Sequence, residues 1–384
     1  MAAPPQHKPG AGTSCFCCGL LVVGLLCALQ EPEAPPTPKR APRPPRPLRT
    51  FDDVKLDLDE EVPQVTYAPP PKTPLEAPIH DRPPAPRRAP GLPNRTKVAL
   101  LQQARNKQTN GAVTLVVAGH AHLELLMNWL VAYERHSSNY IIGCLDTTLF
   151  DVLRRKGIDC VLVPNQSGPL MPGLRLQEMA RRRGPDARPR ASVWESRMRM
   201  VLCLLRASYN VTISDTDAVF LSDASSWLTG FDLVASRGNF PEWSSARWGA
   251  SLCLGLARFN PGAHVAALTK HLVERTQSLR DDQLAVNHVL HEADVAWAPE
   301  TSDGKLLFAT STTTAAGVTR LVKVGLLPHA KFVRDCSHGT RGAVVVHCVS
   351  RSVDAKREAL ESAGAWVLRD DWRDVADLRH MGVT

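Results

Sequence analysis

Short apolar runs alternate with segments of helical spacing from residue 112 onward. The run Ala112–Ala118 (AVTLVVA) is continuous and rich in β-branched residues, which is typical of a strand buried on both faces of a parallel sheet. Residues 122–135 follow, with apolar side chains three and four positions apart, as on one side of a helix. The pattern then predicts a strand at 140–145, a helix at 148–156 and a strand at 160–163. This β-α-β-α-β order predicts a mostly parallel sheet joined by right-handed crossovers.

The same alternation continues toward the end of the chain. Residues 193–206 have helical spacing and lead into an apolar strand at 209–214. Further strands are predicted at 231–236, 251–259, 295–299 and 343–347, and further helices at 261–279, 282–291 and 352–363. Residues 165–190 are rich in Gly, Pro and Arg and predict a long loop, which is either functional or disordered. Residues 98–384 therefore indicate one α/β domain, large enough to bury a substantial core.

Proline is distributed unevenly along the chain. Of the 31 prolines, 22 lie at or before Pro93, and most of these fall in a proline-rich segment at 31–97 that also carries an acidic patch. Such a sequence buries too little apolar surface to fold, and its prolines keep it extended. We predict a disordered stem over residues 31–97 that acts as a spacer.

An apolar segment precedes this stem. No charged residue occurs between Pro9 and Gln30, and residues 15–29 (CFCCGLLVVGLLCAL) are almost wholly apolar. A run of about 15 such residues is short for a membrane span and also fits a cleaved signal peptide. No A-x-A cleavage site follows the run, which favours an uncleaved signal-anchor over residues 1–30 and a single-pass type II protein. With either interpretation, anchored or secreted, the rest of the chain enters an oxidising lumen.

The charge and the cysteines argue against two kinds of site. The net charge of +8 is spread along the chain without a basic face interleaved with aromatics, so we expect no nucleic-acid partner. Six cysteines follow the apolar segment, and none belongs to a C-x-x-C pair, which argues against a zinc–thiolate site. They allow up to three disulfides, or buried free thiols, and Cys336 and Cys348 are the closest pair in the expected topology.

The sharpest chemical feature is Ser214-Asp215-Thr216-Asp217, at the end of the strand at 209–214. Ligands of parallel α/β sheets collect at the carboxyl ends of the strands. Two carboxylates there, with no basic residue between them, are costly to bury unless a cation neutralises them. Oxygen ligands favour Mg²⁺ or Mn²⁺, which are often shared with substrate phosphates. The alternative is a solvated turn whose aspartates cap a helix.

Several segments, in order, resemble the nucleotide-diphospho-sugar transferase family, which includes plant and algal xylosyl-, arabinosyl- and galactosyltransferases of the retaining kind. The resemblance covers about residues 114–347 and is carried by IIGCLDTTLFDVLRRKGIDCVLV, SRMRMVLCLLRASYNVTISDTDAVFLSD, SLCLGLARFNPG, DDQLAVNHVL and VVVHC. It implies a GT-A-like single α/β domain that moves a sugar from a nucleoside diphosphate donor, in the first instance a UDP-sugar, to a glycan or glycoprotein acceptor. With the anchor, it implies a Golgi membrane protein whose catalytic domain is lumenal. The sequence departs from the family pattern at Ser208, Arg237 and the residues after His347, which leaves the donor sugar and the acceptor open.

The resemblance also assigns metal-binding roles. In GT-A enzymes the second aspartate of the motif usually binds the metal, so Asp217 is the expected direct ligand. Asp215 is expected to contact the metal through water or to hold the ribose. His347 is implied as a third ligand, and the alternative is a hydrogen-bonded histidine at a strand end. An imidazole beside carboxylates favours Mn²⁺ over Mg²⁺.

Three residues on helices are candidates for the chemistry at the sugar and the phosphates. Asp282 and Gln283 open a helix, where they would hold donor-sugar hydroxyls or face the anomeric carbon. The alternative for the aspartate is a cap or a partner of the helix dipole. Arg197, on the helix before the D-x-D strand, is a candidate contact of the diphosphate or a surface charge.

Loop residues complete the set of candidates. Gly119 and His120 follow the first strand, where GT-A folds bind the nucleotide and where glycine permits close backbone approach. Asp146 ends the second strand and is a candidate contact of the base or ribose. Trp243 and Trp248 would stack on an acceptor sugar or belong to a small satellite core.

Two functions of other classes are compatible with these features. A catalytically inactive relative would act as a glycan-binding or scaffold protein of the Golgi, although retention of Asp215, Asp217 and His347 argues against it. A phosphotransfer enzyme with an aspartyl nucleophile would carry D-x-D on its first strand, whereas here the motif follows about the fourth strand.

Overall fold

The structure is a computed structural model of the chain, and it describes residues 91–163, 187–293, 296–300, 306–313, 319–350 and 352–373. The predicted anchor (1–30) and most of the predicted stem (31–97) lie outside these residues, so both stay predictions. Within the described part, no helix combines the length and the apolar character that crossing a membrane requires.

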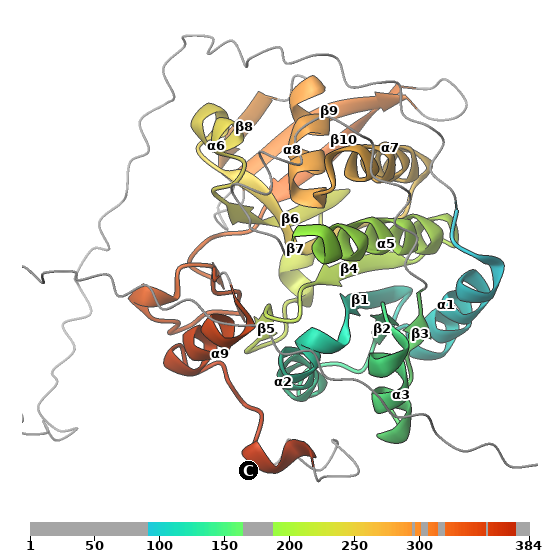
Figure 1. Cartoon of the computed structure of the whole chain (residues 1–384). Helices are drawn as coiled ribbons and strands as arrows, with labels where there is room; N and C mark the ends of the chain where they lie inside the picture. Colours follow the sequence, from blue (N-terminus) through green and yellow to red (C-terminus); the bar gives the residue numbers. More distant parts are fainter. Residues whose placement is uncertain are drawn as a thin grey trace, which may run out of the picture. The chain divides into compact units, whose positions relative to one another are not determined.

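The centre of the fold is a nine-stranded mixed sheet with the order β3-β2-β1-β4-β7-β6-β10-β9-β8 (Figure 1). Its strands are β1 Ala112–Ala118, β2 Tyr140–Cys144, β3 Val161–Leu162, β4 Asn210–Ser214, β6 Leu233–Gly238, β7 Ser251–Phe259, β8 Ala296–Glu300, β9 Leu306–Thr313 and β10 Thr319–Leu326. β3, β2, β1 and β4 pair in parallel, as the β-α-β pattern predicts. β7 runs antiparallel to both β4 and β6, and β9 runs antiparallel to β8 and β10. The prediction of a mostly parallel sheet is therefore confirmed, with β7 and β9 as the reversed strands.

Helices cover both faces of the sheet, which is why the first strand is apolar throughout. Val113, Leu115 and Val117 of β1 belong to one buried cluster, whereas Val116 and Ala118 belong to another on the opposite face. Alternate residues of a strand point to opposite faces, so a strand covered on both sides must be apolar at every position.

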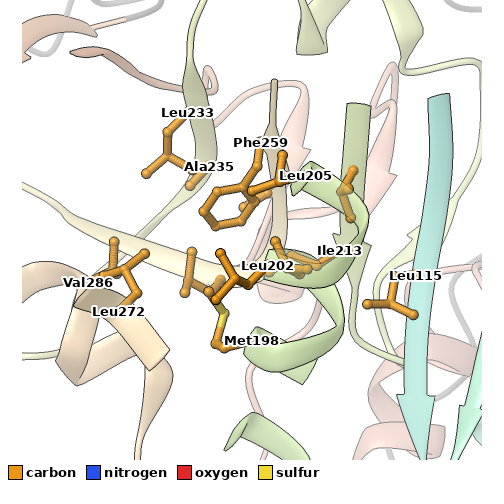
Figure 2. Close-up of a cluster of buried hydrophobic side chains, with 14 of the residues drawn as sticks. Leu115, Met198, Leu202, Leu205, Ile213, Leu233, Ala235, Phe259, Leu272 and Val286 are labelled. Carbon is orange, nitrogen blue, oxygen red and sulfur yellow. The ribbon is translucent and has the colours of Figure 1, made fainter. Parts of the chain in front are cut away.

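The helices are α1 Asn94–Lys107, α2 Leu123–Glu134, α3 Thr147–Arg155, α5 Ala187–Arg206, α6 Glu242–Trp248, α7 Ala263–Leu279, α8 Asp282–Glu292 and α9 Val353–Ser362. The cluster under α5, α7 and α8 is the larger core, and α2 and α3 pack into the cluster on the other face. Figure 2 shows part of the larger core, drawn with Leu115, Met198, Leu202, Leu205, Ile213, Leu233, Ala235, Phe259, Leu272 and Val286 labelled. Because α5 packs across the sheet directly before β4, the core fixes the position where the D-x-D motif emerges.

A second, three-stranded sheet lies beyond the D-x-D motif. It has the order β11-β12-β5, with β5 Val219–Phe220, β11 Phe332–Val333 and β12 Val345–Val346. β5 follows the motif directly, and β12 pairs antiparallel with it, Val345 opposite Phe220 and Val346 opposite Val219. A disulfide joins Cys336, which follows β11, to Cys348, which follows β12. The predicted pairing of these two cysteines is therefore confirmed. The small sheet thus brings the end of the VVVH run next to a motif 130 residues earlier.

Several element boundaries differ from the sequence prediction. α5 begins at Ala187, inside the segment predicted as a loop, and residues 164–186 lie outside the described part. α6 forms in the tryptophan-containing segment predicted as a loop, and β9 and β10 form a hairpin that the pattern did not indicate. α1 begins at Asn94 and crosses the predicted domain boundary at residue 98.

α1 gives a stability prediction for the start of the folded part. A chain shortened to begin at Gly91 should keep the stability of the full chain, because it retains α1. A chain that begins at Gln108 loses the fully buried Leu100 and Ala104 side chains and should lose about 3 kcal/mol of unfolding free energy. Urea denaturation followed by circular dichroism measures both. Equal stability of the two shortened chains would contradict a structural role of α1.

Candidate metal and donor site

The D-x-D motif forms a tight turn at the carboxyl end of β4. The amide of Asp215 donates to the carbonyl of Gly255 on the neighbouring β7 at 2.7 Å, and Ala218 N–H donates back to the Asp215 carbonyl at 3.1 Å. The Asp217 side chain is only 3% exposed, whereas the Asp215 side chain is 32% exposed. The turn therefore buries one carboxylate and leaves the other partly open to solvent.

His347 lies against both carboxylates. Its backbone N–H donates to the Val333 carbonyl at 2.8 Å, which extends the pairing of β12 with β11. Its Nε2 lies 3.6 Å from Asp215 Oδ2 and 3.6 Å from Asp217 Oδ1. One ligand atom from each of the three side chains falls within 4.8 Å of the others.

These three side chains fit a single divalent cation. Ligand atoms on an octahedral ion with bonds of about 2.1 Å lie about 3 Å apart, close to the observed separations. Two carboxylates and an imidazole form a mixed O/N donor set, which suits Mn²⁺ and also accepts Mg²⁺. The structure therefore brings together the predicted Asp215, Asp217 and His347, and the identity of the ion stays a prediction.

The space beside these ligands depends on Gly255. The pairing of β7 with β6 is irregular here. The adjacent residues Ala235 and Ser236 of β6 pair with Ala257 and Cys253 of β7, so the pairing skips residues 254–256. A Cβ atom at Gly255 would lie 2.8 Å from Asp215 Oδ2 and 2.9 Å from His347 Nδ1, and it would overlap His347 Cε1. Cβ atoms do not approach other atoms so closely, so only glycine leaves room for the group.

Lys356 of α9 neutralises part of the buried acidic charge. Its Nζ lies 2.5 Å from Asp217 Oδ2. Burial alone would raise the pKa of Asp217, but the charges of Lys356 and then His347 outweigh it and hold that pKa far below its usual range. Burial lowers the pKa of His347, whereas the negative Asp217 beside it raises that pKa, with a net increase to about 9. Asp217 is therefore an ionised ligand candidate despite its burial.

Arg197 connects the motif to the start of α8. Its Nη1 contacts Asp215 Oδ1, while Nε and Nη2 donate to Asp282 Oδ2 at 3.0 and 2.5 Å. Burial raises the pKa of Asp282, Arg197 lowers it and Asp281 raises it, with a result of about 6. The Arg197 side chain is 3% exposed and both its partners are carboxylates. The structure thus places Arg197 as a buried link between Asp215 and Asp282, which corrects the alternative of a surface charge.

At the start of α8, the helix cap and the candidate site residues are different side chains. The N-cap is Asp281, whose carboxylate accepts from Leu284 N–H at 2.8 Å, so the interpretation of Asp282 as the cap is wrong. Gln283 donates from Nε2 to the Phe240 carbonyl at 2.5 Å, which holds the segment before α6 against α8. Asp282 is therefore linked to Asp215 through Arg197. Gln283 instead contacts the segment that precedes α6.

The nucleotide-binding candidates lie at the ends of β1 and β2. Asp146 caps α3, because Oδ1 accepts from Leu149 N–H at 2.8 Å, and Oδ2 accepts from His120 N–H at 2.8 Å. A Cβ atom at Gly119 would lie 3.0 Å from Asp146 Oδ2. Gly119, His120 and Asp146 thus form one linked corner in which both carboxylate oxygens already accept backbone hydrogen bonds.

The tryptophans lie on α6. The rings of Trp243 and Trp248 are 6.5 Å apart, and Trp243 also lies 4.9 Å from the His288 ring and 5.1 Å from the His291 ring. Trp248 is buried, which favours the satellite-core alternative for this residue. Trp243 is partly exposed and stays a candidate for acceptor stacking.

Sequence reasoning missed Gly255 and Lys356. Gly255 lies within SLCLGLARFNPG, a segment that carried the family resemblance, but no local feature shows that its missing Cβ faces a histidine 92 positions later. Lys356 lies on a helix with alternating charges, where a surface lysine is the ordinary expectation.

Fold and site together define an α/β protein with a candidate divalent-cation site at the carboxyl edge of its sheet. The sequence profile described as Nucleotide-diphospho-sugar transferase matches residues 135–360. That match covers more than half of the chain and includes the whole Asp-Asp-His group. The chain belongs to the nucleotide-diphospho-sugar transferase family, whose members are glycosyltransferases that use nucleotide-sugar donors.

No curated protein matches the sequence significantly. Among solved structures, the glycosyltransferase GlyE of Streptococcus pneumoniae TIGR4 superposes with a TM-score of 0.37 and 12% identity, over 70% of this chain and 62% of that one. The galactosyltransferase LgtC, solved in complex with donor and acceptor sugar analogs, gives a TM-score of 0.33 and 11% identity, over 68% of this chain and 99% of that one. This chain thus spans less than two thirds of the GlyE chain.

Proposed function

We propose that this chain is a divalent-cation-dependent, retaining glycosyltransferase of the GT-A type. It would transfer a sugar from a nucleoside diphosphate donor, in the first instance a UDP-sugar, to a glycan or glycoprotein acceptor. The observation that carries this proposal is the group of Asp215, Asp217 and His347, within 4.8 Å of one another, in a member of a nucleotide-diphospho-sugar transferase family.

The residues of the site divide the work as follows. Asp217 and His347, with Asp215, would hold Mn²⁺ or Mg²⁺. When bound, such an ion acts as a Lewis acid that offsets the negative charge of the departing diphosphate. Arg197 orients the Asp215 carboxylate by pairing with it, and it fixes the position of Asp282 by the same guanidinium. Because Asp282 leads directly to Gln283, these two residues are the candidates for contacts with the donor sugar.

The predicted N-terminal features set the proposed location. A signal-anchor at residues 1–30 and an extended stem at 31–97 would make the chain a type II Golgi membrane protein with its catalytic domain in the lumen. The Cys336–Cys348 disulfide is compatible with an oxidising compartment. Cleavage of the apolar segment would instead yield a secreted enzyme.

A donor screen tests the proposal. Purified chain beginning at Gly91, mixed with Mn²⁺ and a panel of nucleotide sugars, should release nucleoside diphosphate from at least one of them. Release should disappear with excess chelator and return when Mn²⁺ is restored, because the buried carboxylates need the cation to bind the diphosphate. Full activity in excess chelator would contradict cation dependence. Donor binding without turnover, with every acceptor class tried, would favour the inactive glycan-binding alternative.

A further inference from the structure

Arg334 is a cation of the site region for which the described residues offer no ion-pair partner. It follows β11, and its backbone carbonyl accepts from Val349 N–H at 3.2 Å. Its Nη1 atom is buried and has no hydrogen-bond partner, and Arg334 forms no ion pair in the part of the chain that the structure describes. A buried donor that lacks an acceptor is unfavourable, so the position is expected to be completed by something that is not part of the described chain.

The backbone places Arg334 beside the candidate metal ligand. Val333, the preceding residue, accepts from the backbone N–H of His347, and the disulfide of Cys336 with Cys348 links the two segments again just beyond. Arg334 and His347 directly follow the paired strands β11 and β12, and two independent links hold them side by side.

Arg334 also lies near two other residues of this site, since its charge acts on Cys253 of β7 and on His347 directly after β12.

The other cations of the site are already paired. Arg197 pairs with Asp215 and Asp282, and Lys356 pairs with Asp217. Arg334 differs from both, since no carboxylate of the described chain contacts it. Its planar fork of N–H donors matches the oxygens of a phosphate group.

We propose that Arg334 binds a non-bridging oxygen of the β-phosphate of the donor's diphosphate, at the candidate cation site. The role rests on the proposed function, because it requires a nucleoside diphosphate at the cation site. Arg334 is then a donor-binding residue for both the intact donor and the released nucleoside diphosphate, and it balances charge that one divalent cation leaves uncompensated.

The test compares nucleotides that differ by one phosphate. Titration calorimetry in the presence of Mn²⁺ gives the affinities for UDP and UMP, and for GDP and GMP in parallel. In the wild-type chain the diphosphate should bind more tightly than the monophosphate. Arg334→Gln should reduce that preference about 10- to 100-fold, as expected for loss of a charge-assisted hydrogen bond, and Arg334→Lys should restore part of it. Arg341→Gln removes the same charge from an exposed position in the same segment and should leave the preference unchanged.

Three results would overturn the proposal in different ways. If the wild-type chain binds neither UDP nor GDP with Mn²⁺, the proposed function fails and the role of Arg334 fails with it. If the wild-type chain binds a diphosphate and Arg334→Gln keeps the full preference over the monophosphate, only the role of Arg334 is wrong. If Arg334→Gln weakens the binding of Mn²⁺ alone, Arg334 acts by positioning His347. Unchanged Mn²⁺ affinity with a reduced diphosphate preference would support direct contact.

Discussion

Asp217→Asn should lower kcat/KM for sugar transfer by about a thousandfold while the protein stays folded. The substitution keeps the shape of the side chain but removes the charge that the cation needs, and a cation contributes several kcal/mol to the stabilisation of a leaving group. The buried Asp217 also balances Lys356, 2.5 Å away, so some loss of stability is expected as well. Nucleoside diphosphate release with saturating Mn²⁺ measures the first effect, and thermal unfolding measures the second.

A second prediction concerns the contribution of His347 to Mn²⁺ binding. If Asp217 and His347 bind one ion, each alanine variant should weaken Mn²⁺ affinity steeply, and the double variant should be little worse than the worse single one. Residues that act as a unit are not additive. The ion should be titrated in the presence of nucleoside diphosphate. Unchanged Mn²⁺ affinity in His347→Ala would remove the histidine from the site and return it to the role of a buried strand-end residue.

The first half of the sheet could be predicted from the sequence, because the residues of each strand there match the environment that the strand occupies. β1 is apolar at every position since both its faces are covered, and helical spacing marks the segments that connect it to β2 and β3. Strand direction is a different matter. β7 has the same apolar character as β4, yet it runs antiparallel, and nothing in a continuous apolar run records its direction.

The candidate site shows the same division between local and distant information. The D-x-D motif is local, so its position after β4 could be predicted from the sequence. His347 became a candidate ligand only through the family resemblance, because its approach depends on the pairing of β5 with β12. At the start of α8 the local chemistry is ambiguous, since Asp281 and Asp282 are adjacent and either can cap a helix. The tertiary partner Arg197 decides between them, and a partner 85 positions away leaves no local signal.

Among glycine-to-alanine changes in the described residues, Gly255→Ala should be the most damaging to the cation site. The added Cβ would lie 2.8 Å from Asp215 Oδ2 and would overlap the His347 ring. The imidazole cannot move away easily, because its backbone is paired with Val333 and the next residue is in a disulfide. Either β7 or the imidazole must shift, and a displacement of about 1 Å at a catalytic site costs about a hundredfold in rate. We expect Mn²⁺ affinity and turnover to fall together.

Gly143→Ala is the matched control for this change. Gly143 lies in the buried strand β2 of the same sheet, and its added methyl would meet Met200 Sδ at 3.1 Å, Met200 Cε at 3.2 Å and Val117 Cγ2 at 3.2 Å. A flexible methionine can give way by a few tenths of an ångström, so this variant should lose some stability and keep its Mn²⁺ affinity. Equal Mn²⁺ affinity and turnover of Gly255→Ala and Gly143→Ala would contradict this prediction. The His347 ring could then move away from the added methyl, and the close packing of β7 against the ligand group would not be required for the reaction. A selective loss in Gly255→Ala would instead tie the irregularity of β7 directly to the cation site, because both variants add the same atom to the interior of the same sheet.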